Sequence, residues 1–210
     1  MPDLAALARS LLPGGVATAG GPVAAWQGPL LGDEGAALTR ARPARRAEFT
    51  AGRCAARAAL ARLGLPPVPL PRDRRGPALW PPGVTGSISH GAGQVLAAVA
   101  HGSALAGLGI DVEAAGAFVP LDEIATSDEI AALGSRDPVL LFSAREAAFK
   151  AQFTLTGRML EFRDLALELG DGHFHARLGT AAPPLPAGMR IAGRWAVREG
   201  IVVTAAAIAA

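Results

Sequence analysis

The sequence predicts an α+β protein made of two lobes of about 100 residues each. Three observations lead to this prediction. The chain has 210 residues, enough for one large domain or two small ones. Both halves contain helical and strand-like segments, and the second half ends in four alternating runs typical of antiparallel strands. No repeat of fixed period is visible, so a twofold relation between the lobes has to be structural. We place the boundary between residues 1–105 and 106–210.

The first half is expected to contain two helices and three strands. In chain order these are a short helix with Leu4, Leu7, Leu11 and Leu12 on one side, a strand near residues 23–26, a long helix over 42–63, and strands over 86–90 and 94–100. Alanine and leucine favour the long helix, and the glycine and prolines at 64–67 end it. The proline-rich connection 66–82 is long for a compact domain, and such loops often carry function.

The second half is expected to begin with a strand and end in a meander. In chain order we predict a strand over 108–113, helices over 123–133 and 138–153, and strands over 165–169, 173–178, 190–197 and 201–208. Glu199 and Gly200 mark a hairpin turn between the last two strands.

Composition excludes several classes of protein. Half of the residues are hydrophobic, which is enough for a sizeable core, and the net charge of +2 is too small to indicate nucleic-acid binding by itself. The single cysteine, Cys54, cannot form an internal disulfide, which fits a reducing compartment. Neither a signal-peptide pattern nor an apolar run of membrane-spanning length is present. We therefore expect a soluble cytoplasmic protein without membrane association.

The arginines are distributed unevenly. They crowd the segment 40–62 and recur in the connection at Arg72, Arg74 and Arg75. On a helix Arg46, Arg53 and Arg57 lie along one stripe, with Arg45 to its side. The guanidinium fork suits phosphate, so the segment indicates either an anionic ligand or a solvated arginine face.

Lys150 is the only lysine in the chain. It stands four residues after Glu146, so on a helix the two side chains share a face. A compact ammonium serves sites that a planar guanidinium does not. The alternative is an ordinary surface ion pair in an alanine-rich helix.

Carboxylates occur near the centre of the chain. Asp111 and Glu113 alternate on a predicted strand and so point to one face, where Glu146 can join them. Three converging carboxylates need a cation, and hard oxygens of this kind suit Mg²⁺. Glu113 can also be read as a surface residue at a strand end. His90, after Ser89, is either a phosphate donor or a packed loop histidine.

These residues together favour phosphoryl or nucleotidyl transfer. Walker A, nucleophile-elbow, zinc-binding and dinucleotide-binding patterns are absent from the sequence. The low aromatic content, 5%, disfavours a nucleic-acid-binding module because single-strand binders stack bases on aromatic rings.

Three segments in order carry a family resemblance: Gly86-Ser87-Ile88-Ser89-His90, Gly109-Ile110-Asp111-Val112-Glu113, and Phe142-Ser143-Ala144-Arg145-Glu146-Ala147-Ala148-Phe149-Lys150. They resemble the three successive motifs of the 4′-phosphopantetheinyl transferases. The segments 45–57, 79–81, 154–158 and 193–195 resemble the enterobactin-synthetase-associated, surfactin-type branch of that family.

The resemblance implies a fold and an activity. The fold is two pseudo-twofold-related lobes, each a small antiparallel sheet with packed helices, with coenzyme A in the cleft between them. The activity is Mg²⁺-dependent transfer of 4′-phosphopantetheine from coenzyme A to a serine of an apo acyl or peptidyl carrier protein, releasing adenosine 3′,5′-bisphosphate. The resemblance favours a monomer and names no pathway. A catalytically silent relative that docks carriers is the alternative within this family.

The resemblance also assigns roles. Asp111, Glu113 and Glu146 would hold Mg²⁺ on the pyrophosphate. The 3′-phosphate end of coenzyme A would bind Arg45, Arg53 and Arg75, and its phosphates would also contact Ser89 and His90. Glu146, directly or through a water, would accept the serine proton, and Lys150 would stabilise charge on the phosphate.

Four positions leave questions open in this assignment. Arg145 and Arg75 stand where the family commonly has lysine. Gly91 replaces a larger residue beside the pocket. Arg46 remains an alternative to Arg45 as the phosphate ligand.

Overall fold

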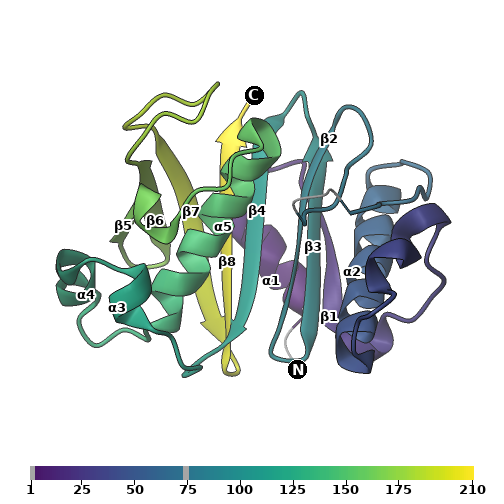
Figure 1. The fold of residues 1–210 in the computed structure, drawn as a ribbon, viewed down its shortest axis with the longest axis horizontal. Coiled ribbons are helices and arrows are strands. Elements are labelled where there is room, and N and C mark those ends of the chain that lie inside the picture. Colours follow the sequence, from purple (N-terminus) through teal and green to yellow (C-terminus); the bar gives the residue numbers. More distant parts are fainter. Residues whose placement is uncertain (1–2, 73–75) are drawn as a thin grey trace.

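The computed structural model describes residues 3–72 and 76–210 and contains two antiparallel sheets with helices packed against them. Figure 1 shows the smaller sheet beside α2 and the larger sheet beneath α5. The predicted α+β class, with two small antiparallel sheets and packed helices, is confirmed.

The smaller sheet has the strand order β1-β3-β2, with β1 at Ala17–Pro22, β2 at Val84–Gly91 and β3 at Gln94–His101. Helix α2, Pro43–Arg62, packs on β1 and β3 through fully buried alanines at positions 51, 55 and 59. Small side chains let the helix approach the sheet closely, so its larger residues can point elsewhere.

The larger sheet has the order β4-β8-β7-β6-β5. Its strands are β4 at Leu105–Ala114, β5 at Leu165–Leu169, β6 at His173–Leu178, β7 at Arg190–Arg198 and β8 at Ile201–Ala209. Helix α5, Val139–Thr156, covers β4 and β8 (Figure 1). The predicted hairpin at Glu199 and Gly200 is confirmed, with positive φ at both residues.

The two sheets meet where β2 lies against β4. The Ser87 hydroxyl accepts a hydrogen bond of 3.1 Å from the Ile110 amide across this contact. Helix α1, Leu4–Leu11, lies against both sheets, and one hydrophobic cluster includes Leu4, Leu96 and Leu108 from α1, β3 and β4. The two halves of the chain are therefore joined by a shared core.

Two predicted elements differ in the structure. The strand near residues 23–26 is wrong, because the strand is β1 at Ala17–Pro22 and Val23–Ala25 forms a 3-10 turn, η1. β1 pairs with β3, and a Cβ on Gly20 would lie 2.4 Å from the Val95 carbonyl oxygen. A strand built around such a glycine lacks the β-branched and aromatic residues that mark strands in a sequence.

The predicted helix over 123–133 is divided into α3, Leu121–Ile124, and α4, Ser127–Leu133. Thr126 separates them as an N-cap, because its hydroxyl accepts from the Glu129 amide while the Glu129 carboxylate accepts from the Thr126 amide. Two further 3-10 segments, η2 at Gly32–Leu38 and η3 at Phe162–Asp164, complete the fold. In the part of the chain that the structure describes, no helix has the length and apolar character needed to cross a bilayer.

Candidate active site

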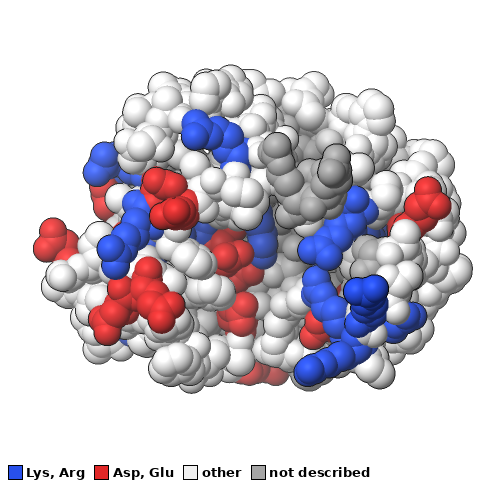
Figure 2. Space-filling view, in the orientation of Figure 1, with Lys and Arg blue, Asp and Glu red and all other residues white. Residues whose placement is uncertain are grey.

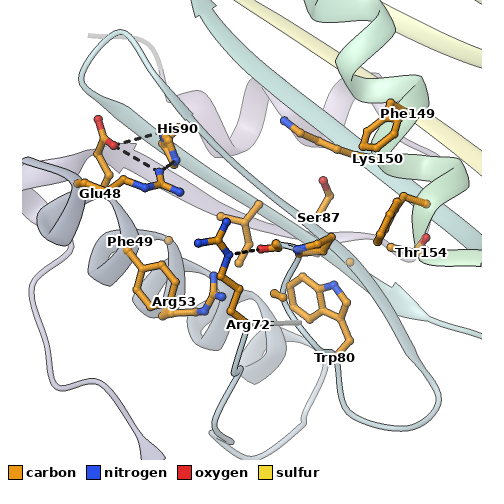
Figure 3. Close-up of a pocket in the computed structure, with 18 of the residues that line it drawn as sticks. Glu48, Phe49, Arg53, Arg72, Trp80, Ser87, His90, Phe149, Lys150 and Thr154 are labelled. Carbon is orange, nitrogen blue, oxygen red and sulfur yellow. Dashed lines mark hydrogen bonds and ion pairs between the residues drawn. The ribbon is translucent and has the colours of Figure 1, made fainter. Parts of the chain in front are cut away.

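A cavity of about 280 Å³ lies between α2, β2 and α5. Figure 3 shows its two sides: Phe49 and Arg53 project from α2, and Phe149, Lys150 and Thr154 project from α5. The connection before β2 contributes Arg72 and Trp80. Cationic groups therefore approach the cavity from both halves of the chain.

Lys150 is bound to β2 and β4. Its Nζ atom lies 2.7 Å from Oδ1 of Asp111, 3.1 Å from the Ser89 hydroxyl and 3.2 Å from the Ile110 carbonyl oxygen. The Ser89 hydroxyl donates to the same Asp111 oxygen at 2.8 Å. Three of the predicted site residues, from three different elements, thus form one hydrogen-bonded cluster.

Glycines allow this cluster to form. A Cβ on Gly109 would lie 1.8 Å from the Ala147 carbonyl oxygen, and one on Gly107 would lie 2.3 Å from the carbonyl oxygen of Ala151. Strand β4 therefore touches the backbone of α5 at a distance that only glycine permits. This contact brings Asp111 on the strand within reach of Lys150 on the helix.

The carboxylates of the cluster influence one another. Burial, together with the charges of Asp111 and Glu146, raises the pKa of Glu113 to about 7 against the opposing effect of Lys150. Burial likewise raises the pKa of Glu146, where Lys150 opposes the increase. Oδ2 of Asp111 is buried and has no hydrogen-bond partner among the described residues. Each of these features favours a further cation at this position.

The carboxylates are not assembled as a finished metal cage. Within 3–72 and 76–210, no three His, Cys, Asp or Glu side chains come together as a metal-binding group. The Lys150 ammonium lies 4.0 Å from Glu146 and 2.7 Å from Asp111, and so lies between two of the predicted ligands.

The opposite end of the cavity carries Arg45, Glu48 and His90. Arg45 donates to Nε2 of His90, and the Glu48 carboxylate lies 3.5 Å from Arg45 and 3.6 Å from Nδ1 of His90 (Figure 3). Burial lowers the pKa of His90, and the neighbouring Arg45 charge lowers it further. His90 is therefore neutral near pH 7 in this arrangement.

Comparison with known proteins identifies the family. Residues 33–100 match the family model of the 4′-phosphopantetheinyl transferase N-terminal domain. The chain is 45% identical over 198 residues to the 4′-phosphopantetheinyl transferase Svp of Streptomyces mobaraensis, an alignment that covers 86% of this chain and 79% of that protein. The chain belongs to the 4′-phosphopantetheinyl transferases.

Two further relatives agree. The transferase is 37% identical to Npt of Nocardia iowensis over 79% of this chain and 83% of that protein. It is 34% identical to PptT of Mycobacterium tuberculosis, with 83% of this chain and 84% of that protein covered. Both relatives are 4′-phosphopantetheinyl transferases. The predicted family and the predicted activity, transfer of phosphopantetheine to carrier proteins, are confirmed.

Arg53 of the transferase is buried in the cavity wall. Its Nε donates to the Leu70 carbonyl oxygen at 2.7 Å, and its guanidinium lies 4.1 Å from the centre of the Phe49 ring. Burial lowers the pKa of Arg53 to about 10, with a smaller opposing effect from Glu34. The group remains a cation at neutral pH and is held in one orientation.

Two arginines of the predicted stripe do not line this cavity. Arg46 donates to the carbonyl oxygens of Leu38 and Ala41, at 2.7 and 3.3 Å. Arg57 pairs with the buried Glu34 at 2.8 Å. Both fasten α2 to the segment before it. Arg45, and not Arg46, is the residue of the pair that faces the cavity.

Arg145 has a structural position in the transferase. Its side chain is 1% exposed, and its guanidinium donates to Glu129 at 2.6 Å and to the Leu165 carbonyl oxygen at 3.1 Å. These contacts connect α5 to α4 and β5. Arg75 lies outside the described residues.

Arg72 and Trp80 are among the lining residues for which the sequence indicates no site role. The Nε atom of Arg72 donates to the Gly76 carbonyl oxygen at 2.9 Å, and the residue lines the cavity. A Cβ on Gly86 would lie 2.7 Å from the Trp80 ring, so the first motif glycine accommodates this indole. Gly86 was therefore the position in the sequence that could have indicated an aromatic ring lining the cavity.

Proposed function

We propose that this cavity holds coenzyme A, with its nucleotide end against α2 and its pyrophosphate beside Asp111. Residues 1–105 would supply the cations for the nucleotide end, and residues 106–210 the carboxylates and Lys150. The observation that carries this placement is that Lys150, which is hydrogen-bonded to Asp111 and Ser89, lines the same cavity as Arg45 and Arg53.

The proposed phosphate ligands come from several elements. Arg45, Arg53, Arg72 and His90 would bind the 3′-phosphate end, with Arg75 as a fifth candidate, and Ser89 and Lys150 would contact the pyrophosphate. Figure 2 supports this, because basic side chains gather on the α2 side of the molecule and acidic ones over the centre and the other side. Arginine donors match phosphate oxygens in pairs, which fixes orientation as well as charge.

The residues present fit a bound Mg²⁺. Asp111 offers one buried oxygen that has no hydrogen-bond partner among the described residues. Glu113 and Glu146 have raised pKa values because burial and the charge of Asp111 disfavour their charged forms. Asp111, Glu113 and Glu146 would hold the ion together with pyrophosphate oxygens. When bound, Mg²⁺ would neutralise charge that develops on the pyrophosphate.

The protein's own groups would then position and move a proton. Glu146 would accept the proton of the carrier serine, directly or through a water, and its raised pKa suits a base that works near neutral pH. The serine oxygen forms a bond to the phosphorus of the phosphopantetheine phosphate. The bond from that phosphorus to the bridging oxygen breaks, and adenosine 3′,5′-bisphosphate leaves. Lys150 would stabilise the negative charge on the transferred group.

The proposed partner is an apo acyl or peptidyl carrier protein, and the protein itself is proposed to act as a monomer. The test is mass spectrometry of apo carriers incubated with the protein, coenzyme A and Mg²⁺. We expect the mass of phosphopantetheine to appear on the carrier serine and to disappear when a chelator replaces Mg²⁺. Carriers that stay unmodified across peptide, polyketide and fatty-acid types would refute the assignment.

A further inference from the structure

Glu48 is acidic, whereas the arginines and the lysine among the described residues that line the cavity are cationic. It lies one turn after Arg45 on α2, and its carboxylate faces both Arg45 and His90. Figure 3 shows Glu48 and His90 at one end of the cavity, and Arg45 contacts both of them. The proposed role of this end is to bind phosphate, and a carboxylate there opposes an incoming anion.

The contacts of Glu48 are weak and exchangeable. The two distances, 3.5 Å to Arg45 and 3.6 Å to His90, exceed those of a good charge-assisted hydrogen bond. The Glu48 side chain is 38% exposed and that of Arg45 is 45% exposed. Exposed pairs with such geometry contribute little to folding, so the carboxylate can move away at small cost.

The hydrogen bonding of His90 also indicates that Glu48 occupies the position of a bound anion. A guanidinium only donates, so its contact with Arg45 makes Nε2 of His90 the acceptor. The neutral ring then carries its proton on Nδ1, the nitrogen that faces Glu48. Donors of both residues are thus directed at the protein's own groups. Because the Glu48 carboxylate lies near both Arg45 and Nδ1 of His90, a phosphate that binds here competes with it for these two residues.

We propose that Glu48 is an internal competitor for the 3′-phosphate subsite and sets how tightly the nucleotide end is held. This inference rests on the proposed function, because it needs a phosphate at Arg45. A phosphate monoester carries more charge than a carboxylate and offers three oxygens, so it displaces Glu48, whereas a hydroxyl does not. Glu48 lowers the affinity for any nucleotide with a 3′-phosphate, the leaving product included.

The test is calorimetric titration of adenosine 3′,5′-bisphosphate and of 3′-dephospho-coenzyme A into the full chain. Glu48→Gln should tighten binding of the bisphosphate by about threefold to fivefold, the change that corresponds to loss of an exposed ion pair. Binding of 3′-dephospho-coenzyme A should stay within about twofold, because it brings no phosphate to Arg45. Glu48→Ala should behave in the same direction.

The matched control is Glu168→Gln. Glu168 lies on β5 and pairs with Arg190 at 2.8 Å, outside the residues that line the cavity, and its substitution changes the net charge by the same amount. It should leave the affinity for the bisphosphate unchanged. Equal tightening in Glu168→Gln would show a general charge effect and overturn the inference.

A double-mutant cycle locates the competition. Arg45→Gln should weaken bisphosphate binding by about tenfold, and adding Glu48→Gln to it should then gain less than about twofold. Weaker or unchanged binding in the single variant Glu48→Gln would overturn the inference while Arg45→Gln still supports the phosphate subsite. Unchanged binding in Arg45→Gln would instead refute the proposed placement of the nucleotide.

Discussion

Lys150 is closer to Asp111 than to Glu146, although Glu146 stands one turn earlier on its own helix. The Nζ atom lies 2.7 Å from Asp111 and 4.0 Å from Glu146. The long-range contact therefore dominates the local one, and the lone lysine connects α5 to β4. This relationship places the ammonium where phosphate and metal charge are proposed to meet.

Asp111→Asn is expected to reduce transfer at least about 100-fold, because a neutral amide keeps the shape of the side chain while losing the charge that binds a metal. The measurement is the rate of mass gain on an apo carrier at fixed Mg²⁺, with thermal unfolding as a check of folding. Asp171→Asn is the control, since Asp171 is 97% exposed and pairs with Arg136. Transfer near the normal rate in Asp111→Asn would contradict the ligand role.

Lys150→Arg is expected to lower the turnover number by about 10- to 100-fold. The ammonium donates to three oxygens of Asp111, Ser89 and Ile110, and a planar guanidinium cannot reproduce that geometry. Steady-state kinetics with saturating coenzyme A checks this. Arg136→Lys provides the converse exchange at a half-buried residue that does not line the cavity, where no effect on turnover is expected. A wild-type turnover number for Lys150→Arg would mean that charge alone suffices.

The sequence predicted the residues of the Asp111 cluster, because their types and order match family motifs and helical spacing. The resemblance also named Arg45 and Arg53, which line the cavity, but helical spacing alone did not separate them from Arg46 and Arg57. Arg57 and Arg46 lie on α2 beside Arg53, yet Arg57 is taken by Glu34, 23 positions earlier, and Arg46 by a carbonyl oxygen eight positions earlier. Both contacts are made to η2, and the helical periodicity of α2 contains no information about how η2 packs against it.

The first strand shows the same limit at the level of the fold. β1 is Ala-Thr-Ala-Gly-Gly-Pro, a segment with weak strand propensity, and it is a strand because β3 pairs with it. The apolar residues at 23–26 have the better local pattern but form a turn. Tertiary pairing overrode propensity at this position.

Gly109→Ala is expected to destabilise the fold by about 1–3 kcal/mol and to reduce transfer, because the new methyl group would meet the Ala147 carbonyl oxygen and separate β4 from α5. Urea unfolding and the transfer assay measure the two effects. Gly14→Ala is the matched control, since no heavy atom of the described residues, apart from Gly14 and its chain neighbours, lies within 4 Å of its Cβ position. A Gly109→Ala protein with normal stability and activity would show that the two backbones can separate without consequence.

The buried pair of Glu129 and Arg145 predicts a loss of stability in acid. Burial alone would raise the pKa of Glu129, but the amides of Thr126 and Leu167 and the Arg145 charge outweigh it and lower the pKa. Because the pKa of Glu129 is lower in the folded state, its ionisation stabilises the fold at pH values above the unfolded pKa of about 4.3. This stabilisation is lost as the pH falls through the folded pKa. Glu129→Gln should therefore lower the unfolding free energy by about 3 kcal/mol at pH 7 and weaken its decline in acid. Parallel pH curves for the two proteins, measured by urea unfolding, would contradict this.

Arg45 and Arg46 give the sharpest comparison because they are adjacent and carry the same charge. Arg45 lines the cavity, whereas Arg46 donates to the backbone at Leu38 and Ala41. Arg45→Gln should weaken coenzyme A binding by about tenfold with little change in unfolding temperature. Arg46→Gln should lower the unfolding temperature while the affinity for coenzyme A stays within about twofold. The substitution removes hydrogen bonds to two backbone carbonyl oxygens and no contact with the ligand. Calorimetric titration and thermal unfolding of both variants separate the two roles. If coenzyme A binding weakened in Arg46→Gln and not in Arg45→Gln, Arg46 and not Arg45 would be the phosphate ligand.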